Sequence, residues 1–173
     1  QRQGVELAYS VAFDEVTVGA SYNYLKATFE SPFVSFSPVN PLGANRQVNP
    51  GDVIPGQPQH QFKLHADWQI NQDLSVGTEF LYASDSYYRG DEANENKKIP
   101  SYSIINVYFA YQISPQLSLS AKVDNLFDRE YETFGTYGEA DEVLEDFYPD
   151  VDEPYFVGPA RPRSVSVGVN YKF

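Results

Sequence analysis

The sequence predicts an all-β chain that forms part of an antiparallel, membrane-spanning β-barrel, and three observations support this fold class. Seven segments alternate apolar and polar residues with a period of two, which indicates strands with two different faces. Each segment has about the 9–11 residues that a tilted strand needs to cross a bilayer. The connections between segments are alternately short and long, as in outer-membrane barrels.

The first four segments lie in the N-terminal half of the chain. Their apolar faces carry, in order, Val5, Leu7, Tyr9, Val11 and Phe13; Val18, Ala20, Tyr22 and Tyr24; Phe62, Leu64, Ala66, Trp68 and Ile70; and Leu74, Val76, Phe80 and Tyr82. The opposite faces are polar or small. A turn at 71–73 would pair Trp68 with Val76 on the apolar face and His65 with Glu79 on the polar face.

The last three segments repeat the pattern. The fifth spans 102–113, and the apolar faces of the three carry Ile105, Val107, Phe109 and Tyr111; Leu117, Leu119, Ala121 and Val123; and Val165, Val167, Val169, Tyr171 and Phe173. A turn at 114–116 would bring Tyr108 beside Lys122 and Asn106 beside Asp124, with Phe109 and Ala121 on the other face. Lipid outside and water inside would produce this alternation.

The lengths of the connections separate a barrel from a soluble sandwich, which also alternates. Short turns are expected at 14–15, 71–73 and 114–116, and long loops at 30–57, 84–101 and 131–161. All turns then lie at one end of the sheet and all loops at the other. This asymmetry favours the barrel, with periplasmic turns and external loops. A soluble carbohydrate-binding sandwich remains a third interpretation.

Composition excludes several kinds of site. The formal net charge is −12, so we expect no nucleic-acid partner, because phosphate binding needs a basic surface. The chain has no cysteine, so neither a disulfide nor a thiolate metal site can form. Its two histidines, His60 and His65, have odd spacing and fall on opposite strand faces. We expect no cofactor and no enzymatic activity, because no catalytic constellation has the required strand context.

Two stretches resemble a known family. The segment "VDNLFDREY" at 123–131, followed downstream by "RPRSVSVGVNYKF" at 161–173, resembles the C-terminal end of TonB-dependent outer-membrane receptors. The residues that carry this resemblance are Asn125, Leu126, Phe127, Asp128 and Tyr131, together with the terminal aromatic residue. The stretches 52–70 and 83–114 also look like preceding strands of such receptors.

The resemblance implies a bacterial outer-membrane barrel of about 22 strands with a plugged lumen, of which residues 1–173 would supply the last seven. Because seven is odd and single-chain bacterial barrels have even numbers of strands, we expect either a C-terminal piece of a longer chain or one chain of a split barrel. The rest of the barrel and its N-terminal plug would then be partners.

The resemblance also implies active uptake of a scarce ligand, such as a ferric siderophore, haem or cobalamin, with energy from the inner-membrane TonB complex. A metal chelate, in particular a ferric siderophore, is the expected ligand. Membrane lipid and lipopolysaccharide would surround the barrel. The alternative is a passive porin or structural outer-membrane barrel, which needs no plug.

Two of these resembling stretches have expected roles, one in assembly and one at a strand end. Val169, Tyr171 and Phe173 resemble the terminal signal that is read by the barrel assembly machinery. Residues 125–128 lie where the sixth strand ends, so Asn and Asp side chains could bond the neighbouring backbone, with Leu126 and Phe127 packed at the rim. Strand-end architecture is favoured over ligand contact.

Candidate ligand-binding residues lie in the long loops. Tyr87, Tyr88 and Arg89 combine an aromatic pair with a cation, which suits an anionic, ring-bearing ligand. Tyrosines near a membrane interface are equally expected as an aromatic girdle. In the last loop, Tyr137 and Phe147 are the aromatic residues expected to contact the ligand over the barrel mouth.

An acidic stretch at 139–153 holds eight carboxylates. Carboxylate oxygens suit hard cations, so Asp141, Glu142, Asp146 and Asp150 are possible cation contacts, or could bridge to lipopolysaccharide through divalent ions. No calcium-loop motif is present, and a solvated external loop is favoured.

Overall fold

The computed structural model describes residues 1–138 and 154–173, and within them every regular element is a β-strand. Among these residues no helix is long and apolar enough to span a membrane. The predicted all-β, antiparallel architecture is confirmed.

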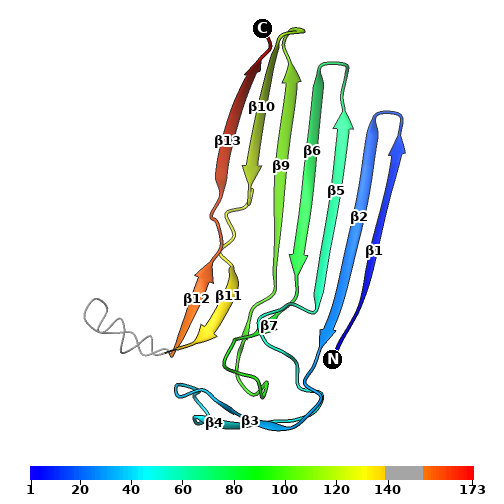
Figure 1. Ribbon diagram of the computed structural model, residues 1–173. Helices are drawn as coiled ribbons and strands as arrows, with labels where there is room; N and C mark the ends of the chain where they lie inside the picture. Colours follow the sequence, from blue (N-terminus) through cyan, green and yellow to red (C-terminus); the bar gives the residue numbers. More distant parts are fainter. Residues whose placement is uncertain (139–153) are drawn as a thin grey trace, which may run out of the picture.

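One seven-stranded antiparallel sheet dominates the structure (Figure 1). Its strands, in spatial order, are β1 (Arg2–Phe13), β2 (Val16–Ala27), β5 (His60–Gln69), β6 (Leu74–Ala83), β9 (Tyr102–Gln112), β10 (Leu117–Asp124) and β13 (Ser164–Tyr171). Each corresponds to one predicted segment. Each strand of the large sheet pairs with the sheet strand that precedes or follows it in the chain, because short turns and long loops connect adjacent strands.

The register follows the predicted alternation. Trp68 pairs with Val76 and His65 with Glu79, and Tyr108 pairs with Lys122 as expected. Strands β9 and β10 pair as far as Val107, which lies opposite Val123. Beyond that point the side chain of Asn106 bonds Glu79 and Asn125.

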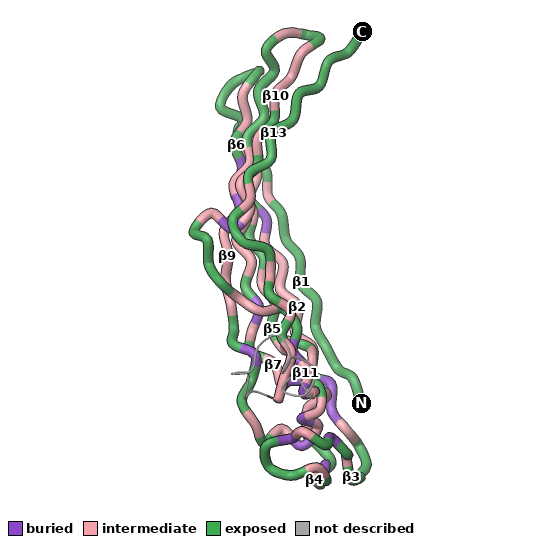
Figure 2. The backbone as a smooth tube through the Cα atoms, turned by 90° about the vertical axis from the view of Figure 1, so that its left-hand side faces the viewer, coloured by how far each residue is buried: buried purple, intermediate pink, exposed green. Residues whose placement is uncertain are grey.

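The two faces of the sheet differ in chemistry. Exposed apolar residues occupy one face, and β1 and β13 are exposed along nearly their whole length (Figure 2). On the other face the Tyr108 hydroxyl donates to Asp67, two strands away. Gly77 of the intervening strand makes this possible, because a Cβ there would lie 2.1 Å from the Tyr108 ring.

Gly19 and His65 form a second pair of this kind on the polar face. A Cβ at Gly19 would lie 2.1 Å from the imidazole. The two residues are direct register partners on β2 and β5. In both pairs a ring from one strand therefore covers a glycine of the next.

Short turns and long connections lie at opposite ends of the sheet, as predicted (Figure 1). In the turn after β5, the Asn71 side-chain oxygen accepts hydrogen bonds from the backbone of Asp73 and Leu74. This local side-chain bonding satisfies backbone donors where the ladder ends.

The long connections contain short strands that the sequence did not predict. These are β3 (Phe33–Phe36) with β4 (Asn45–Val48), β7 (Ser86–Tyr87) with β8 (Lys98–Ile99), and β11 (Glu132–Tyr137) with β12 (Tyr155–Pro159). Most buried apolar residues belong to this end, including Val48, Tyr88, Ile99 and Tyr137. The large sheet is a single layer, whereas the loops build a small core.

The outer strands of the sheet, β1 and β13, each pair with only one neighbour in the described structure. The sheet is therefore open. The described residues alone do not form the predicted closed barrel of about 22 strands. Each edge presents a row of backbone donors and acceptors.

The assignment of the two faces can be tested at adjacent residues of equal depth. We expect Ala121→Arg, on the apolar face, to destabilise the chain folded in lipid by about 2–4 kcal/mol if this face meets lipid, because charge at the midplane of a lipid-facing surface is costly. Ser120→Arg, on the polar face, should cost far less. Denaturant unfolding in lipid vesicles measures both, and equal penalties would contradict the assignment.

Candidate functional site

The candidate site is the assembly formed by the three long connections, which we call the first (28–59), second (84–101) and third (125–163) loops. Backbone and side-chain bonds cross between them. Gly56 N donates to Tyr87 O at 2.9 Å, and Arg89 N donates to Gly135 O at 3.1 Å. The described parts of the loops therefore hold one another in place.

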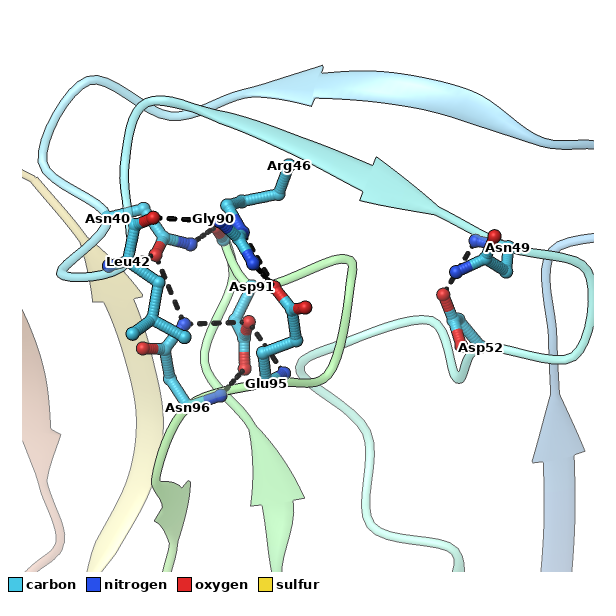
Figure 3. Close-up of polar contacts among 9 residues, drawn as sticks. All are labelled: Asn40, Leu42, Arg46, Asn49, Asp52, Gly90, Asp91, Glu95 and Asn96. Carbon is cyan, nitrogen blue, oxygen red and sulfur yellow. Dashed lines mark hydrogen bonds and ion pairs between the residues drawn. The ribbon is translucent and has the colours of Figure 1, made fainter.

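The Asp91 carboxylate is the centre of the polar network between the first and second loops (Figure 3). The side chain has an exposed fraction of 0%. It accepts hydrogen bonds from the backbone N–H groups of Glu95 and Asn96, and from Asn96 Nδ2 at 2.9 Å. These donors offset the cost of burying a charge.

Side chains of the first loop complete this network (Figure 3). Asn40 Nδ2 donates to Gly90 O at 3.3 Å, and Asn40 Oδ1 accepts from Asn96 Nδ2 at 3.2 Å. Arg46 binds the exposed Glu95 carboxylate, with an Nε–Oε2 distance of 2.6 Å. The sequence Arg89-Gly90-Asp91 spells an adhesion tripeptide, but full burial keeps the Asp91 carboxylate from binding another protein.

The backbone of the second loop is also paired to the third. Arg89 forms an isolated parallel bridge with Thr136, and Tyr137 N donates to Arg89 O at 2.8 Å. The two predicted regions, 87–89 and Tyr137, are therefore brought together although they lie far apart in the sequence.

An aromatic cluster adjoins this bridge, because Tyr88 and Tyr137 are the sequence neighbours of Arg89 and Thr136. Tyr88 is 3% exposed, and its ring centroid is 5.6 Å from that of Tyr137 and 5.2 Å from that of Tyr155. Ile99 and Val39 pack against it. Burial, and then the Glu132 carboxylate, raise the pKa of the Tyr88 hydroxyl. Tyr88 and Tyr137 thus form the core of the loops, and their rings contact protein.

Exposed cations lie over aromatic rings around this core. Lys97 Nζ lies 3.8 Å from the Tyr155 ring centroid and Lys98 Nζ lies 4.7 Å from that of Tyr87. The Arg89 guanidinium lies 5.3 Å from the Phe134 ring centroid. A hydrogen bond from Lys98 to Asp85 raises the pKa of the ammonium group. Lys97, Lys98 and Phe134 were not among the predicted site residues.

The Asn-Leu-Phe-Asp motif forms a strand-ending turn. Asn125 and Asp128 adopt left-handed backbone conformations with φ of 51° and 54°. The Asp128 carboxylate accepts a hydrogen bond from Arg163 N at 2.8 Å, and Tyr131 lies against Tyr102 with ring centroids 4.3 Å apart. These contacts agree with strand-end architecture. Phe127, which was expected to pack at the rim, is 72% exposed in this chain.

Next to this turn lies a cleft of about 660 Å³. One arm of the third loop contributes residues 128–132 and the other contributes Val157, Pro159, Ala160 and Pro162. Pro100 and Ser101 of the second loop close one side. Prolines and carboxylates give the cleft a mixed apolar and acidic lining.

Other predicted residues lie elsewhere. Phe147, Asp141, Glu142, Asp146 and Asp150 fall outside the described residues. Val169, Tyr171 and Phe173 lie at the turn end of the sheet and are exposed. Within residues 1–138 and 154–173, no group of three or more His, Asp or Glu side chains could hold a metal ion.

Comparisons with known proteins identify related sequences. The family described as "TonB dependent receptor-like, beta-barrel" matches residues 1–126. The ferric enterobactin receptor of Pseudomonas aeruginosa is 35% identical over 86 residues, which cover 46% of this chain and 12% of that protein. The vitamin B12 transporter BtuB of Vibrio cholerae is 26% identical over 92 residues, covering 53% of this chain and 15% of the transporter.

A solved structure shares the fold. The siderophore receptor PiuA from Acinetobacter baumannii superimposes with a TM-score of 0.74 and 21% identity. The superposition covers 99% of this chain and 22% of PiuA. The chain thus spans only a small part of the receptors it matches.

The role of Asp91 can be tested by substitution. We expect Asp91→Ala to loosen the first and second loops, because each donor left without an acceptor in a buried site costs about 1–3 kcal/mol. Hydrogen exchange measured by mass spectrometry should then accelerate in peptides covering 40–46 and 90–97. The turn at 71–73 serves as an internal control. Asp91→Asn, which keeps one acceptor oxygen, should give an intermediate effect, and unchanged loop exchange in Asp91→Ala would contradict the assignment.

The burial of Tyr88 gives a pH prediction. Because the folded-state pKa lies above the ordinary value of about 10, this group stabilises the loops fully below that value, and the contribution is lost as the pH rises through the raised pKa. Subtracting the tyrosinate absorbance titration of Tyr88→Phe from that of the unsubstituted protein should reveal a tyrosine whose hydroxyl ionises at a higher pH than the others. A difference titrating at about pH 10 would contradict its burial.

Proposed function

This chain belongs to the TonB-dependent receptors as part of their β-barrel, and from this we propose that it forms one wall of an outer-membrane receptor for active uptake of a ferric siderophore. The match over residues 1–126 carries the proposal. Relatives named as siderophore receptors and a vitamin B12 transporter support uptake over the passive porin. The proposed role is transport without catalysis.

The open sheet supports its placement in a larger barrel. Unpaired backbone groups cannot be tolerated in lipid, so the outer edges of β1 and β13 require further strands. We propose that residues 1–173 supply the last seven strands of a barrel of about 22. Those further strands, and a plug domain through which the TonB complex acts, belong to other parts of the receptor.

The chemical difference between the two faces of the sheet, and the different connections at its two ends, support one orientation of the sheet in the outer membrane. The apolar face suits lipid and the polar face suits a lumen. The three long loops would then be external, in contact with lipopolysaccharide, and the three short turns periplasmic. Residues 169–173 would serve as the assembly signal.

The exposed cations support an anionic chelate as the ligand. Tyr87, Arg89, Lys97 and Lys98 combine aromatic rings with positive charge, which suits anionic ring systems that hold iron. We propose that Tyr88 and Tyr137 support this surface from beneath. Phe147 and the carboxylates of Asp141, Glu142, Asp146 and Asp150 remain proposed ligand and cation contacts.

The ligand surface can be tested in cells that carry the full receptor. We expect Arg89→Ala or Lys98→Ala to weaken binding of radioiron-loaded enterobactin about 2- to 5-fold, since an exposed cation–ring contact contributes about 0.5–1 kcal/mol. Lys172→Ala, at the opposite end of the sheet, is the matched control.

Binding and uptake are measured separately, with receptor abundance determined by surface labelling. Uptake that persists after loss of TonB would contradict active transport. Unchanged affinity in both loop variants, with normal abundance, would contradict the proposed ligand surface.

A further inference from the structure

The two faces of the large sheet differ in the sign of their charges. Every carboxylate within its seven strands lies on the polar face, and these residues are Glu6, Asp67, Glu79 and Asp124. The apolar face has no acidic residue within these strands, although the chain has 24 acidic and only 12 basic residues. The basic side chains that the strands place on this face are Lys26 and His60.

Both basic residues lie at the loop end of the apolar face (Figure 1). His60 is the first residue of β5 and is opposite Tyr24 of β2. Lys26 is two residues beyond Tyr24, so its side chain shares that face and lies nearer the loops. Exposed apolar residues, including Val5 and Leu64, cover the same face towards the turn end. The two cations therefore mark one margin of an apolar surface.

A third cation reaches this margin from the third loop. Arg129 Nη1 donates to Ser103 Oγ at 3.1 Å. Ser103 is the second residue of β9 and is opposite Tyr82, which places its side chain on the apolar face. In the described part of the chain, the side-chain bonds of Arg129 all leave from Nη1. Nε and Nη2 of its exposed guanidinium can therefore donate to a ligand.

The other two margin residues also have free donors. Among the described residues, none bonds or pairs with the exposed Lys26 ammonium group. His60 Nδ1 is hydrogen-bonded to the Tyr22 hydroxyl at 2.8 Å, and its ring centroid lies 5.1 Å from that of Tyr24. When Tyr22 donates to Nδ1, His60 Nε2 carries the proton and is itself a donor.

Two carboxylates near the margin already have cationic partners. Asp85, just beyond β6, is 3.0 Å from Lys98 Nζ, and Asp128 is 3.9 Å from Arg163 Nη2. These pairs reduce the negative charge beside Lys26, His60 and Arg129. The margin is therefore a local positive region in a chain whose formal net charge is −12.

We propose that Lys26, His60 and Arg129 bind the phosphate groups of a phosphorylated glycolipid whose acyl chains cover the apolar face. Cations at the edge of an exposed apolar surface complement an anionic headgroup above hydrocarbon chains, and guanidinium groups suit phosphate oxygens. Strands β2 and β9 are three positions apart in the sheet, so the donors spread over roughly 14 Å and can hold more than one phosphate. The site rests on the proposed function only in taking this face as lipid-facing and the loop end as external.

Native mass spectrometry of the full receptor in non-ionic detergent measures lipid binding directly. The probes are diphosphoryl lipid A and monophosphoryl lipid A, which lacks one phosphate. We expect the unsubstituted receptor to bind the diphosphoryl form more tightly. Lys26→Gln and Arg129→Gln should each weaken that binding about 5-fold, the contribution of one cation beside an anionic lipid surface. His60→Phe, which keeps a ring next to Tyr24 but removes the donor, should weaken it too.

Lys63→Gln is the matched control, because it makes the same charge change on the polar face of β5. It should leave binding of both lipids unchanged. Folding of each variant is checked by the electrophoretic mobility of unheated samples. Equal binding of the two lipids by the unsubstituted receptor, unchanged binding in both Lys26→Gln and Arg129→Gln, or an equal loss in Lys63→Gln overturns the proposal.

The lipid measurement uses no siderophore and no energy source, so its outcome is independent of the transport assay. A receptor without iron uptake that still distinguishes the two lipids through these residues would retain the glycolipid site and lose the proposed function. Normal uptake without that distinction would retain the function and overturn the site.

Discussion

The need to pair every backbone N–H and C=O group governs this structure. In the large sheet, neighbouring strands satisfy these groups along almost their full lengths, so the side chains of the sheet can be apolar on one face and polar on the other. Where the ladder ends, side chains take over: Asn71 at a short turn, and Asn125 at the strand end. The same demand extends to the loops, where buried Asp91 accepts backbone donors that no strand could reach.

Backbone groups are paired in different ways at the two ends of the sheet. At the turn end, a few residues close each hairpin and most side chains remain exposed. At the loop end, short ladders, a buried carboxylate and an aromatic cluster combine into a second, smaller structural unit. A ligand surface built on these loops is therefore supported by packed side chains rather than by the sheet alone. Such support is what keeps binding groups in a defined geometry.

Sequence periodicity predicted the sheet well because each strand has one apolar face, and a one-residue slip would reverse every side chain. The pairs Trp68–Val76 and His65–Glu79 followed directly from this rule. The loop strands escaped prediction because two to six residues do not establish a period. Asp91 escaped as a network centre because its partners, such as Asn96 and Asn40, are identified only by the folded loops. Tyr88 and Tyr137 were chosen for their rings, but burial cannot be read from aromatic character alone.

The rings that cover glycines have a consequence for how strands find their partners. A slip of two residues keeps apolar and polar faces correct, so alternation cannot prevent it. After such a slip, Tyr108 would face Ser75 or Glu79 instead of Gly77, and His65 would face Thr17 or Ser21 instead of Gly19. None of these positions offers the space that the missing Cβ leaves. Gly19 and Gly77 thus favour the observed strand register over a slip of two residues. A larger residue at either glycine would require a smaller side chain in place of His65 or Tyr108 on the adjacent strand.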